Sequence, residues 1–462
     1  MSVSPARAAA FDTLLRVERD AAFATDALDA RLARMPAGAN PADAALATEL
    51  VMGVLRWRRL LDFLIERVAA RRPESLDLEV LLALRLGLYQ LRVLSRVPAS
   101  AAVNESVELV KQARKRSAAG LVNAALRRAS RDAAITGSLD TLVSSDAPLA
   151  ERLGILWSHP SWIVARWLAR YGEPSTRALL EADNRPPHLC AAALTPAGAC
   201  DALASLVADG FDAAPAQWLA SAIELRGIPR GGVSASTALR DGQILIQDEA
   251  SQMVPLLLGV RAGQRVLDVC AAPGGKTARL ANQAGATNVI AADVHLHRVR
   301  QMREFLSKVH AGNVQTLTLD ATAPLPFAMR FDRILLDAPC SGTGTLARNP
   351  EIRWRLAPAD IAALADKQRA ILQQALAALA PGGRLVYSTC SLEPEENEQV
   401  IASALAATPG ARIVSAQDAL TPHVGAGADV RALFDSNGFF RTFPSTHGSD
   451  GFFAAAVEVS SR

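Results

Sequence analysis

The chain has 462 residues, half of them apolar and 21% charged, so it can bury more than one hydrophobic core and is too long for one ordinary domain. It shows no run of eighteen apolar residues, no signal peptide and no Cys-x-x-Cys pair, so we expect a cytoplasmic protein without a membrane span, disulfide framework or structural zinc site. The net charge of +3 is uneven, because residues 1–135 hold 21 Lys and Arg against 15 Asp and Glu.

Residues 1–140 are predicted to form an all-α domain. From Ser4 to about Asp132, apolar side chains recur at three- and four-residue steps, which fits five to seven helices. Pro and Gly interrupt this period at 35–41, 72–75 and 96–98, where we expect connections. The basic excess of this region suits a polyanion such as RNA, although it equally fits a solvated helical domain rich in arginine.

Two groups of basic residues in this domain are the best placed for RNA phosphates. A charged run is also common on a solvated surface, so both interpretations stay open at this point. The groups are Arg56, Arg58 and Arg59, and Lys111, Arg114, Lys115 and Arg116.

Residues 141–242 carry a weaker signal and are predicted to be a small α+β linker domain. Helices are expected at about 162–171 and 175–182, and Pro186 and Pro187 end the second of them. Short mixed segments follow up to Asp241.

From residue 243 to 462, apolar strands alternate with helices. The predicted strands are 265–270, 288–293, 314–320, 331–337 and 383–390. Strand, helix, strand at this spacing predicts a mostly parallel sheet covered on both faces. Such a sheet binds its ligand at the carboxyl ends of its strands.

The first of these strands runs into a glycine turn. Gly274 and Gly275 allow the backbone to turn tightly and to approach a ligand, and the helix that follows presents free N–H groups. The turn lacks both the G-x-G-x-x-G pattern and the spacing of a P-loop, which disfavours nicotinamide cofactors and ATP.

Three successive strands end in an aspartate, at Asp293, Asp320 and Asp337. One such residue is easily a helix cap or a solvated turn. Three at the same edge of the sheet favour a nucleoside cofactor, whose ribose hydroxyls donate hydrogen bonds to carboxylates.

Two further strands place a thiol at the same edge, in Asp-Ala-Pro-Cys-Ser-Gly-Thr-Gly at 337–344 and in Tyr-Ser-Thr-Cys-Ser at 387–391. Alone, Cys340 or Cys390 is more often a small buried hydrophobe than a nucleophile. Together at the cofactor edge, they favour catalysis.

These two motifs, with Cys-Ala-Ala-Pro-Gly-Gly-Lys at 270–276 and Asp-Gly-Phe-Phe at 450–453, resemble those of the Nol1/Nop2/Sun group of RNA cytosine-C5 methyltransferases. The N-terminal domain resembles the antitermination factor NusB, which points to the bacterial Sun subfamily, whose members methylate cytosine 967 of 16S rRNA. The second likeness rests on Leu55, Arg56 and the segments 86–90, 97–99, 103–105 and 120–123.

The resemblance implies a Rossmann-like class I methyltransferase domain with a mostly parallel seven-stranded sheet, and S-adenosylmethionine as the cofactor. In that group the Thr-Cys cysteine, here Cys390, attacks carbon 6 of the base, and the Pro-Cys cysteine, here Cys340, assists release. Asp337 and Lys276 are implied to contact the cofactor or the base. For Lys276 the alternative is that it is simply a residue at the start of a helix. The implied cofactor residues are Cys270, Ala271, Ala272, Pro273, Gly274, Gly275, Lys276, Asp293, Asp320 and Asp337.

The target cytosine must be unpaired or flipped out, so RNA contacts are expected near the site. Arg348, Arg353, Trp354 and Arg355 follow the Pro-Cys motif and are candidates, with a structural role for Trp354 as the alternative. The Arg-x-Asn element usual in the group after Asn-Arg-Pro is missing after Pro186, which puts fine substrate selection in doubt.

The expected substrate is 16S rRNA, naked or in an early assembly intermediate, and a monomer is expected. One rival is an enzyme of the same class that acts on tRNA or 23S rRNA. The other is a non-catalytic RNA-binding adaptor, against which the two cysteines argue, because an adaptor needs neither of them.

Overall fold

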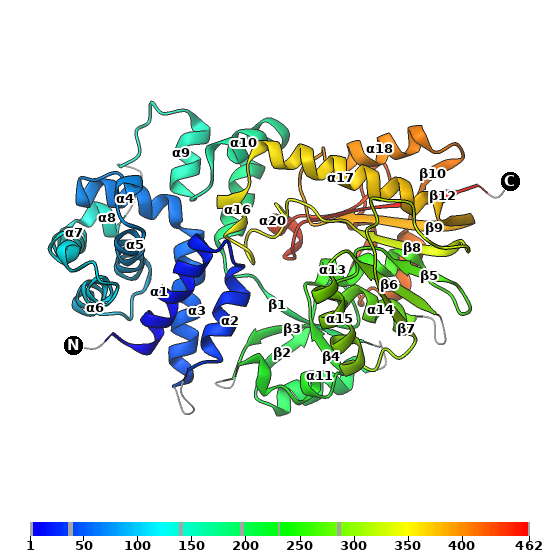
Figure 1. Cartoon of the computed structure of the whole chain (residues 1–462), viewed down its shortest axis with the longest axis horizontal. Coiled ribbons are helices and arrows are strands. Elements are labelled where there is room, and N and C mark those ends of the chain that lie inside the picture. Colours follow the sequence, from blue (N-terminus) through cyan, green and yellow to red (C-terminus); the bar gives the residue numbers. More distant parts are fainter. Residues whose placement is uncertain are drawn as a thin grey trace. The chain divides into compact units, whose positions relative to one another are not determined.

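The computed structural model describes residues 3–35, 40–137, 142–194, 198–229, 232–283 and 288–460. The chain forms two compact units, each built from two segments (Figure 1). The helical unit consists of Met1–Pro186 and Leu346–Arg355, and the α/β unit of Pro187–Thr345 and Leu356–Arg462. The boundary between the two units falls after Pro186, so the region 141–242, which was predicted to be one linker domain, is divided between them. No helix of the described residues is long and apolar enough to span a membrane.

The N-terminal part of the helical unit is all α, as predicted. Its centre is α5, in which every residue from Val80 to Gln90 is buried. Because this helix is apolar on all sides, it is surrounded by the others. The helices are α1 Pro5–Arg19, α2 Ala24–Leu32, α3 Pro41–Arg56, α4 Arg58–Ala69, α5 Leu78–Val93, α6 Ala99–Gln112, α7 Ala119–Arg131 and α8 Ala133–Thr136.

Two of the three predicted connections lie within the described residues. Pro73–Ser75 forms a single 3-10 turn before α5, and Pro98 directly precedes α6. The third prediction, 35–41, falls partly outside the described residues, but Asn40 caps α3 by accepting a hydrogen bond from the N–H of Ala42 (3.0 Å).

The helical unit continues through α9 (Leu149–Leu156) and α10 (Ser161–Asn184). Within α10, Gly172 has a φ of +73° and interrupts the helix two residues before Pro174. The two helices predicted at 162–171 and 175–182 are therefore confirmed as the halves of a kinked helix. The unit also contains the short α16 (Ile352–Arg355), which lies in the sequence between the two segments of the α/β unit.

The α/β unit begins with a four-stranded antiparallel sheet in the order β2-β3-β1-β4. With α11 packed beside it, this is the predicted α+β portion of the linker. Its elements are β1 Leu189–Ala193, α11 Ala199–Ala208, β2 Asp212–Pro215, β3 Ala222–Gly227, α12 Thr237–Arg240 and β4 Ile244–Ile246.

The large sheet has the order β10-β12-β9-β8-β5-β6-β7, and β11 pairs with β12 as an eighth strand. The five adjacent strands from β9 to the edge strand β7 are parallel, whereas β10, β11 and β12 are antiparallel. The expected mostly parallel sheet is therefore confirmed, with seven strands in its main order and β11 added to the seven that were expected. The strands are β5 Val266–Asp268, β6 Val289–Asp293, β7 Val314–Thr318, β8 Phe331–Asp337, β9 Leu379–Thr389, β10 Ala411–Val414, β11 Phe440–Thr442 and β12 Phe452–Val459.

Helices cover both faces of this sheet (Figure 1). Along β8, Ile334 and Leu336 join one apolar core with α17 and α18, whereas Leu335 joins the opposite core. The remaining helices are α13 Glu249–Met253, α14 Gly275–Gln283, α15 Leu296–Lys308, α17 Pro358–Ala377, α18 Glu398–Ala407, α19 Gln417–Leu420 and α20 Pro444–His447.

The strand order reverses between β5 and β8, since the chain runs outward from β5 through β6 to β7 and then returns to β8. In open parallel sheets the ligand lies at the carboxyl ends of the strands at such a reversal. The fold therefore puts the site at the ends of β5 and β8.

Candidate active site

A cavity of about 470 Å³ lies at this edge of the sheet. The ends of β5, β6, β8 and β9 and the loop after β7 all contribute to its walls. It brings together the three predicted aspartates and both predicted cysteines, although they are up to 97 residues apart in the sequence. The predicted residues in its lining are Cys270, Ala272, Asp293, Asp320, Asp337, Cys340 and Cys390.

The glycine turn after β5 forms one wall. Gly274 has a φ of +107°, and a Cβ built on it would lie 2.9 Å from Cγ of Met302 and 3.2 Å from Phe305. Only glycine combines this backbone conformation with so close a neighbour. The turn leads directly into α14, whose first N–H groups have no partner within the helix and can face an anionic group of a ligand.

Asp268, the last residue of β5, was not among the predicted site residues. Its carboxyl group is buried, and its Oδ2 accepts a hydrogen bond from Thr277 Oγ1 (2.7 Å). Its Oδ1 is buried without a hydrogen-bond partner among the described residues. Burial raises the pKa of Asp268 to about 7. An unsatisfied buried acceptor fits a cofactor that carries a positively charged amino group.

Asp293 and Asp320 face the same cavity in different ways. Asp293 is buried, accepts a hydrogen bond from the N–H of His295 (3.0 Å) and forms an ion pair with Arg298 (3.4 Å). Arg298 also donates to the carbonyl of Ala272 (2.7 Å) and lines the cavity, a contribution that the sequence analysis missed. Asp320 is exposed, and the N–H and hydroxyl of Thr322 lower the pKa of its carboxyl group.

Lys276 and Asp337 form an ion pair. Lys276 Nζ donates to Asp337 Oδ2 (2.6 Å), and Ser388 Oγ donates to Asp337 Oδ1 (2.7 Å). Burial lowers the pKa of Lys276, but the carboxylate of Asp337 raises it by more, so the net shift is upward and Lys276 stays an ammonium. Lys276 therefore belongs to the site and is more than a helix-start residue.

The two cysteines are in contact, with 3.4 Å between Cys340 Sγ and Cys390 Sγ. The hydrogen bond with Cys390, burial and the nearby negative charges all raise the pKa of Cys340. Cys340 therefore keeps its proton and can donate it toward Cys390. The pKa of Cys270 is also raised, by burial, which fits a backbone role rather than thiol chemistry.

A second cavity of about 680 Å³ adjoins the first and shares Cys270, Ala272 and Asp337 with it. Its lining includes four more residues of the glycine turn, Ala271, Pro273, Gly275 and Lys276, whereas Gly274 lines neither cavity. Its outer wall comes from β4 and α15, where Ile246 is 36% exposed and Gln301 is also exposed. Two cavities that meet at Asp337 leave room for a cofactor and for a second ligand.

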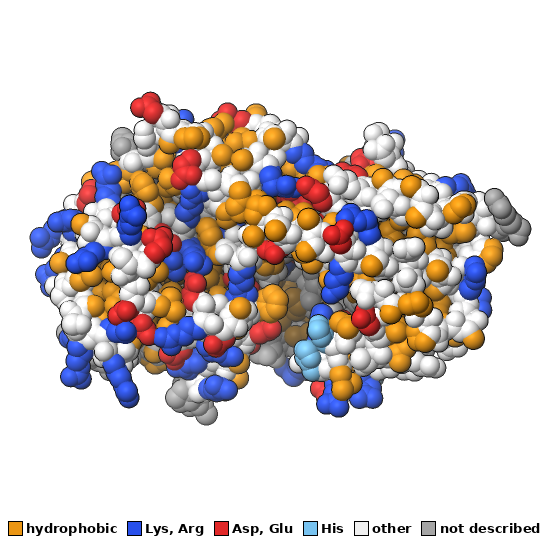
Figure 2. All heavy atoms as spheres, turned by 45° about the horizontal axis from the view of Figure 1, so that its top comes forward, with side chains coloured by type: hydrophobic (Ala, Val, Ile, Leu, Met, Phe, Trp, Pro, Cys, Tyr) orange, Lys and Arg blue, Asp and Glu red, His pale blue; other side chains and the backbone are white. Residues whose placement is uncertain are grey.

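The basic residues do not form one obvious stripe on the face shown in Figure 2. On the face shown in Figure 2, Lys and Arg side chains are interspersed with Asp and Glu among the residues drawn in colour. The positions of individual candidates therefore decide which of them can reach a phosphate.

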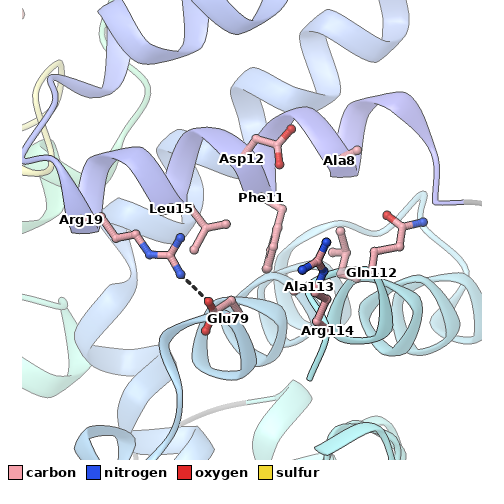
Figure 3. A pocket seen from close by; sticks show the side chains of 10 residues that line it. Ala8, Phe11, Asp12, Leu15, Arg19, Glu79, Gln112, Ala113 and Arg114 are labelled. Atoms are coloured by element: carbon pink, nitrogen blue, oxygen red, sulfur yellow. Dashed lines mark hydrogen bonds and ion pairs between the residues drawn. The ribbon is translucent and has the colours of Figure 1, made fainter. Parts of the chain in front are cut away.

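One candidate group lies on the turn after α6, which we call the basic turn (Lys111–Arg116). Lys111, Arg114 and Arg116 are exposed, while Lys115 pairs with Asp77 (2.9 Å) and Lys111 with Glu108 (2.7 Å). Beside this turn is a pocket of about 300 Å³, which Arg114 lines together with Phe11 and Leu15 of α1 (Figure 3). The ion pair between Arg19 and Glu79 closes one end of it (Figure 3).

The other candidates belong mostly to the interior of the helical unit. We define Leu346–Arg355 as the strap, because this segment follows the Cys340 loop in sequence but packs with α1, α3 and α10. Arg353 is fully buried and donates to Asn184 Oδ1 (3.0 Å) and to the carbonyl of Asp183 (3.1 Å). The prediction that Arg353 contacts an RNA phosphate is wrong, because a guanidinium group without exposed surface cannot reach RNA.

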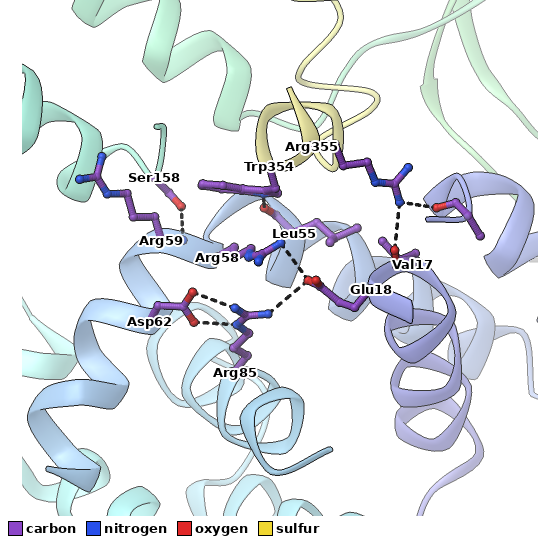
Figure 4. A network of polar contacts seen from close by, with 11 residues as sticks. Val17, Glu18, Leu55, Arg58, Arg59, Asp62, Arg85, Ser158, Trp354 and Arg355 are labelled. Atoms are coloured by element: carbon purple, nitrogen blue, oxygen red, sulfur yellow. Dashed lines mark hydrogen bonds and ion pairs between the residues drawn. The ribbon is translucent and has the colours of Figure 1, made fainter. Parts of the chain in front are cut away.

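Arg56 and Trp354 are likewise engaged inside the helical unit. Arg56 is 6% exposed and donates to the carbonyl of Ala347 in the strap (2.9 Å), so its predicted RNA contact is also contradicted. Trp354 Nε1 donates to the carbonyl of Leu55 (2.6 Å), and Arg58 lies over its ring, with 5.6 Å to the ring centre (Figure 4). These contacts favour the structural role of Trp354, which was the alternative to an RNA contact.

The remaining arginines of this group are only half-buried or exposed. Arg58 pairs with Glu18 (3.0 Å; Figure 4). Arg59 pairs with Glu151 (2.5 Å). Arg355 donates to the carbonyls of Val17 (3.1 Å) and Ala22 (2.6 Å), and Arg348 is half-buried in the strap. These contacts hold the strap against the helices of its unit. The side chains of the basic turn are therefore more accessible to RNA phosphates than the arginines near the strap.

Three families match successive parts of the chain. Residues 4–131 match the NusB family, and residues 159–229 match the ferredoxin-like domain of RsmF/B-like methyltransferases. Residues 255–458 match 16S rRNA methyltransferase RsmB/F. The three matches follow the order of the predicted domains.

Relatives match over most of their length. A protein of Mycobacterium tuberculosis named as a methyltransferase is 37% identical, covering 98% of this chain and 96% of the relative. The ribosomal RNA small subunit methyltransferase B of Pseudomonas putida is 36% identical over 80% of this chain and 83% of its own. The protein of the same name from Vibrio cholerae is 33% identical over 82% and 85%.

Solved structures agree with the fold. A methyltransferase homologue from Pyrococcus horikoshii is 29% identical, with a TM-score of 0.56 over 67% of this chain and 99% of its own. The crystal structure of PH0851 covers 99% of both chains with a TM-score of 0.80, at 24% identity. NSun6 from Pyrococcus horikoshii, solved with the S-adenosylmethionine analogue SFG, has a TM-score of 0.56 over 66% of this chain at 19% identity.

Proposed function

Because this chain belongs to the RsmB/F family of 16S rRNA methyltransferases, we propose that it methylates carbon 5 of one cytosine of 16S rRNA, cytosine 967, through a covalent bond to Cys390. The observation that carries the proposal is the contact between Cys340 and Cys390 at the cofactor edge of the sheet. A pure binding protein gains nothing from two touching thiols at that edge.

S-adenosylmethionine is the cofactor, and it supplies the methyl group from its sulfonium when bound. The described residues fit it. Asp293 would accept hydrogen bonds from the ribose hydroxyls, and Asp320 would accept one from the adenine amino group. The unpartnered Asp268 Oδ1 fits the ammonium group, and the N–H groups of the turn at Gly274 and Gly275 fit the carboxylate.

Cys390 is the proposed nucleophile. Carbon 5 of cytosine is too electron-poor to take a methyl group unaided. The Cys390 thiolate adds to carbon 6, and the electron pair of the carbon 5–carbon 6 double bond moves onto carbon 5, which then accepts the methyl group. The ammonium of Lys276, held by Asp337, stabilises the negative charge that develops on the base during this addition.

Cys340 is proposed to assist release. After methylation, the bond between carbon 6 and Cys390 breaks with its electron pair going to Cys390 Sγ, and the electron pair of the carbon 5–hydrogen bond reforms the double bond. Cys340, which its raised pKa keeps protonated, gives its proton to Cys390 Sγ at 3.4 Å, and Cys340 Sγ takes the carbon 5 proton in its place, so that both cysteines end as thiols.

The RNA is proposed to reach the site with the target base flipped out of any helix. The base would lie where the two cavities meet at Asp337, and the 680 Å³ cavity has room for it and part of its neighbour. Lys111, Arg114, Lys115 and Arg116 remain the proposed phosphate contacts of the helical unit. We also propose that the protein acts as a monomer in the cytoplasm.

The direct test is methyl transfer to unmodified 16S rRNA. The purified protein is incubated with radiolabelled S-adenosylmethionine, and 5-methylcytosine is mapped after digestion. Label at cytosine 967 is expected, and Cys390→Ala should reduce transfer by at least about 10³-fold, because no other group at the site replaces the nucleophile. Label confined to tRNA or 23S rRNA would overturn the substrate, and an active Cys390→Ala protein would overturn the mechanism.

Replacing the other cysteine should separate attack from release. Cys340→Ala leaves the nucleophile in place but removes the group that assists departure. We expect a protein–RNA adduct that survives denaturing electrophoresis and contains the labelled methyl group. If Cys340→Ala turns over like the parent and no adduct appears, Cys340 has no part in release.

A further inference from the structure

Glu396 is a buried carboxyl group that the mechanism above does not use. Its side chain has no exposed surface, and it lies six residues after Cys390 in the sequence. Its Oε1 accepts hydrogen bonds from the N–H of Ser341 (2.8 Å) and from Gln368 Nε2 (2.9 Å). Its Oε2 accepts hydrogen bonds from the hydroxyls of Ser341 and Ser391, the latter at 2.5 Å.

These partners lie next to the two cysteines. Ser341 directly follows Cys340, and Ser391 directly follows Cys390, so one carboxyl group ties the two cysteine loops together. The serine hydroxyls also meet each other, with 3.0 Å between the two Oγ atoms. One backbone bond joins the same loops, from the N–H of Gly344 to the carbonyl of Cys390 (2.9 Å).

Glu396 is itself held in place. Tyr387 Oη donates to the carbonyl of Glu396 (2.5 Å) and to Gln368 Oε1 (3.1 Å). Gln368 Nε2 donates to the carbonyl of Pro339, one residue before Cys340, as well as to Glu396 (both 2.9 Å). α17, β9 and both loops thus meet at this carboxyl group.

Stability alone does not explain a carboxyl group here. Burial raises the pKa of Glu396, against the effect of its hydrogen-bond donors, so the folded protein opposes its ionisation. Apolar side chains of similar volume are often as stabilising as a buried charge. A fully bonded carboxyl group does what they cannot, because its hydrogen bonds fix the directions of the backbone segments around it.

We propose that Glu396 is a positioning residue which holds the sulfur atoms of Cys340 and Cys390 in contact, so that one base can be attacked by the second thiol and released with the help of the first. This rests on the two-cysteine chemistry proposed above. Glu396 itself does not touch the base or the cofactor cavity, whose lining does not include it.

The first test measures the geometry of the thiols without any methyl transfer. Phenylarsine oxide condenses with two neighbouring thiols, forming two arsenic–sulfur bonds and releasing water. The parent protein should bind one reagent molecule through Cys340 and Cys390, seen by intact mass and abolished by Cys340→Ala. In Glu396→Ala the affinity of this bidentate product should fall at least about tenfold, because the two sulfurs are no longer held together.

The second test measures single-turnover methylation. Glu396→Ala should lower the rate about 100-fold, the effect of displacing a reacting group by about 1 Å, while the Kd for S-adenosylmethionine changes less than about twofold. Glu396→Gln keeps the shape and an acceptor oxygen, so it should recover part of both the rate and the arsenical affinity.

Glu249→Gln is the matched control. Glu249 is also a buried carboxyl group, and it accepts hydrogen bonds from the N–H groups of Trp218 and Leu219 (both 2.7 Å), but it lines neither cavity. It should change the unfolding temperature and leave both readouts at the parent level. Parent-like arsenical affinity and rate in Glu396→Ala would overturn the positioning role. A parent that binds the arsenical but methylates no RNA would instead count against the proposed function.

Discussion

Asp268 shows how one buried carboxyl group can serve binding at the expense of stability. The pKa of Asp268 is about 7 in the folded protein, whereas the pKa of an aspartate in an unfolded chain is about 4. The folded protein therefore holds the proton more tightly than the unfolded chain does. The contribution of this group to stability is fully present below about pH 4 and is lost as the pH rises through 7.

Asp268→Asn should consequently stabilise the protein while weakening cofactor binding. The gain in the free energy of unfolding should be on the order of 1–3 kcal/mol above pH 7 and should vanish below about pH 4. The Kd for S-adenosylmethionine should rise, because the amide cannot offer a charged acceptor to the ammonium group. Urea denaturation across this pH range and calorimetric titration of the cofactor provide the measurements, and unchanged binding would remove Asp268 from the site.

At the scale of elements, the strap and the basic turn show that arginine can be either a buried structural residue or an exposed cation. Arg353 in the strap is enclosed by α10 and by the carbonyl of Leu346 (3.1 Å), whereas Arg114 at the end of α6 is exposed. A buried guanidinium orders the chain around it, and an exposed one is available to phosphates.

Arg353→Met should lower the free energy of unfolding by about 2–4 kcal/mol, because it leaves several buried acceptors without donors. It should leave the salt dependence of RNA binding unchanged. Differential scanning calorimetry and binding titrations at 50–200 mM salt measure the two effects. A shallower salt dependence without loss of stability would restore Arg353 as an RNA contact.

Arg114→Gln should show the opposite pattern. The slope of log K against log salt should fall in magnitude by about one phosphate contact, and the unfolding temperature should stay within about 1 °C of the parent. Because Arg114 lies on the surface beside the pocket in Figure 3, no buried partner is lost. If RNA binding keeps its full salt dependence, the basic turn is not where the RNA docks.

At the scale of the whole molecule, neither compact unit is one continuous piece of chain. The helical unit includes the strap from beyond residue 345, and the α/β unit resumes only at Leu356. The segment that carries Cys340 therefore leads, within a few residues, into a segment packed with helices of the other unit.

Removing residues 1–186 should for this reason damage the remaining chain. Trp354 and Arg355 would lose the carbonyls of Leu55 and Val17, and an apolar ring would be left in water. We expect the piece 187–462 to aggregate, and the same piece with Trp354→Ser and Arg355→Ser to give a higher soluble yield on size-exclusion chromatography. Equal, high yields of both pieces would mean that the strap does not depend on the helical unit.

Much of the catalytic site could be read from the sequence because it follows the regular structure. Each strand that ends in Asp293 or Asp337 places its last side chain at one edge of a parallel sheet, and the periodicity of the strands is local information. The glycine turn could also be predicted from a short stretch of sequence, because glycine is the residue type that readily adopts the positive φ found at Gly274. Cys340 and Cys390 came together for the same reason, as ends of the adjacent strands β8 and β9.

The rest depended on contacts between segments far apart in the chain, which no local pattern records. Arg56 and Arg353 look like exposed cations in the sequence, and only the packing of the strap into the helical unit shows that they are buried. Glu396 looks like a helix-start carboxylate, and only the meeting of the two cysteine loops gives it four donors. The sequence by itself determined the succession of helical and strand-containing regions, the parallel sheet and the residues at its edge, because periodicity and turn chemistry are short-range. The tertiary structure alone decided which charges are buried, because burial depends on what packs against each side chain.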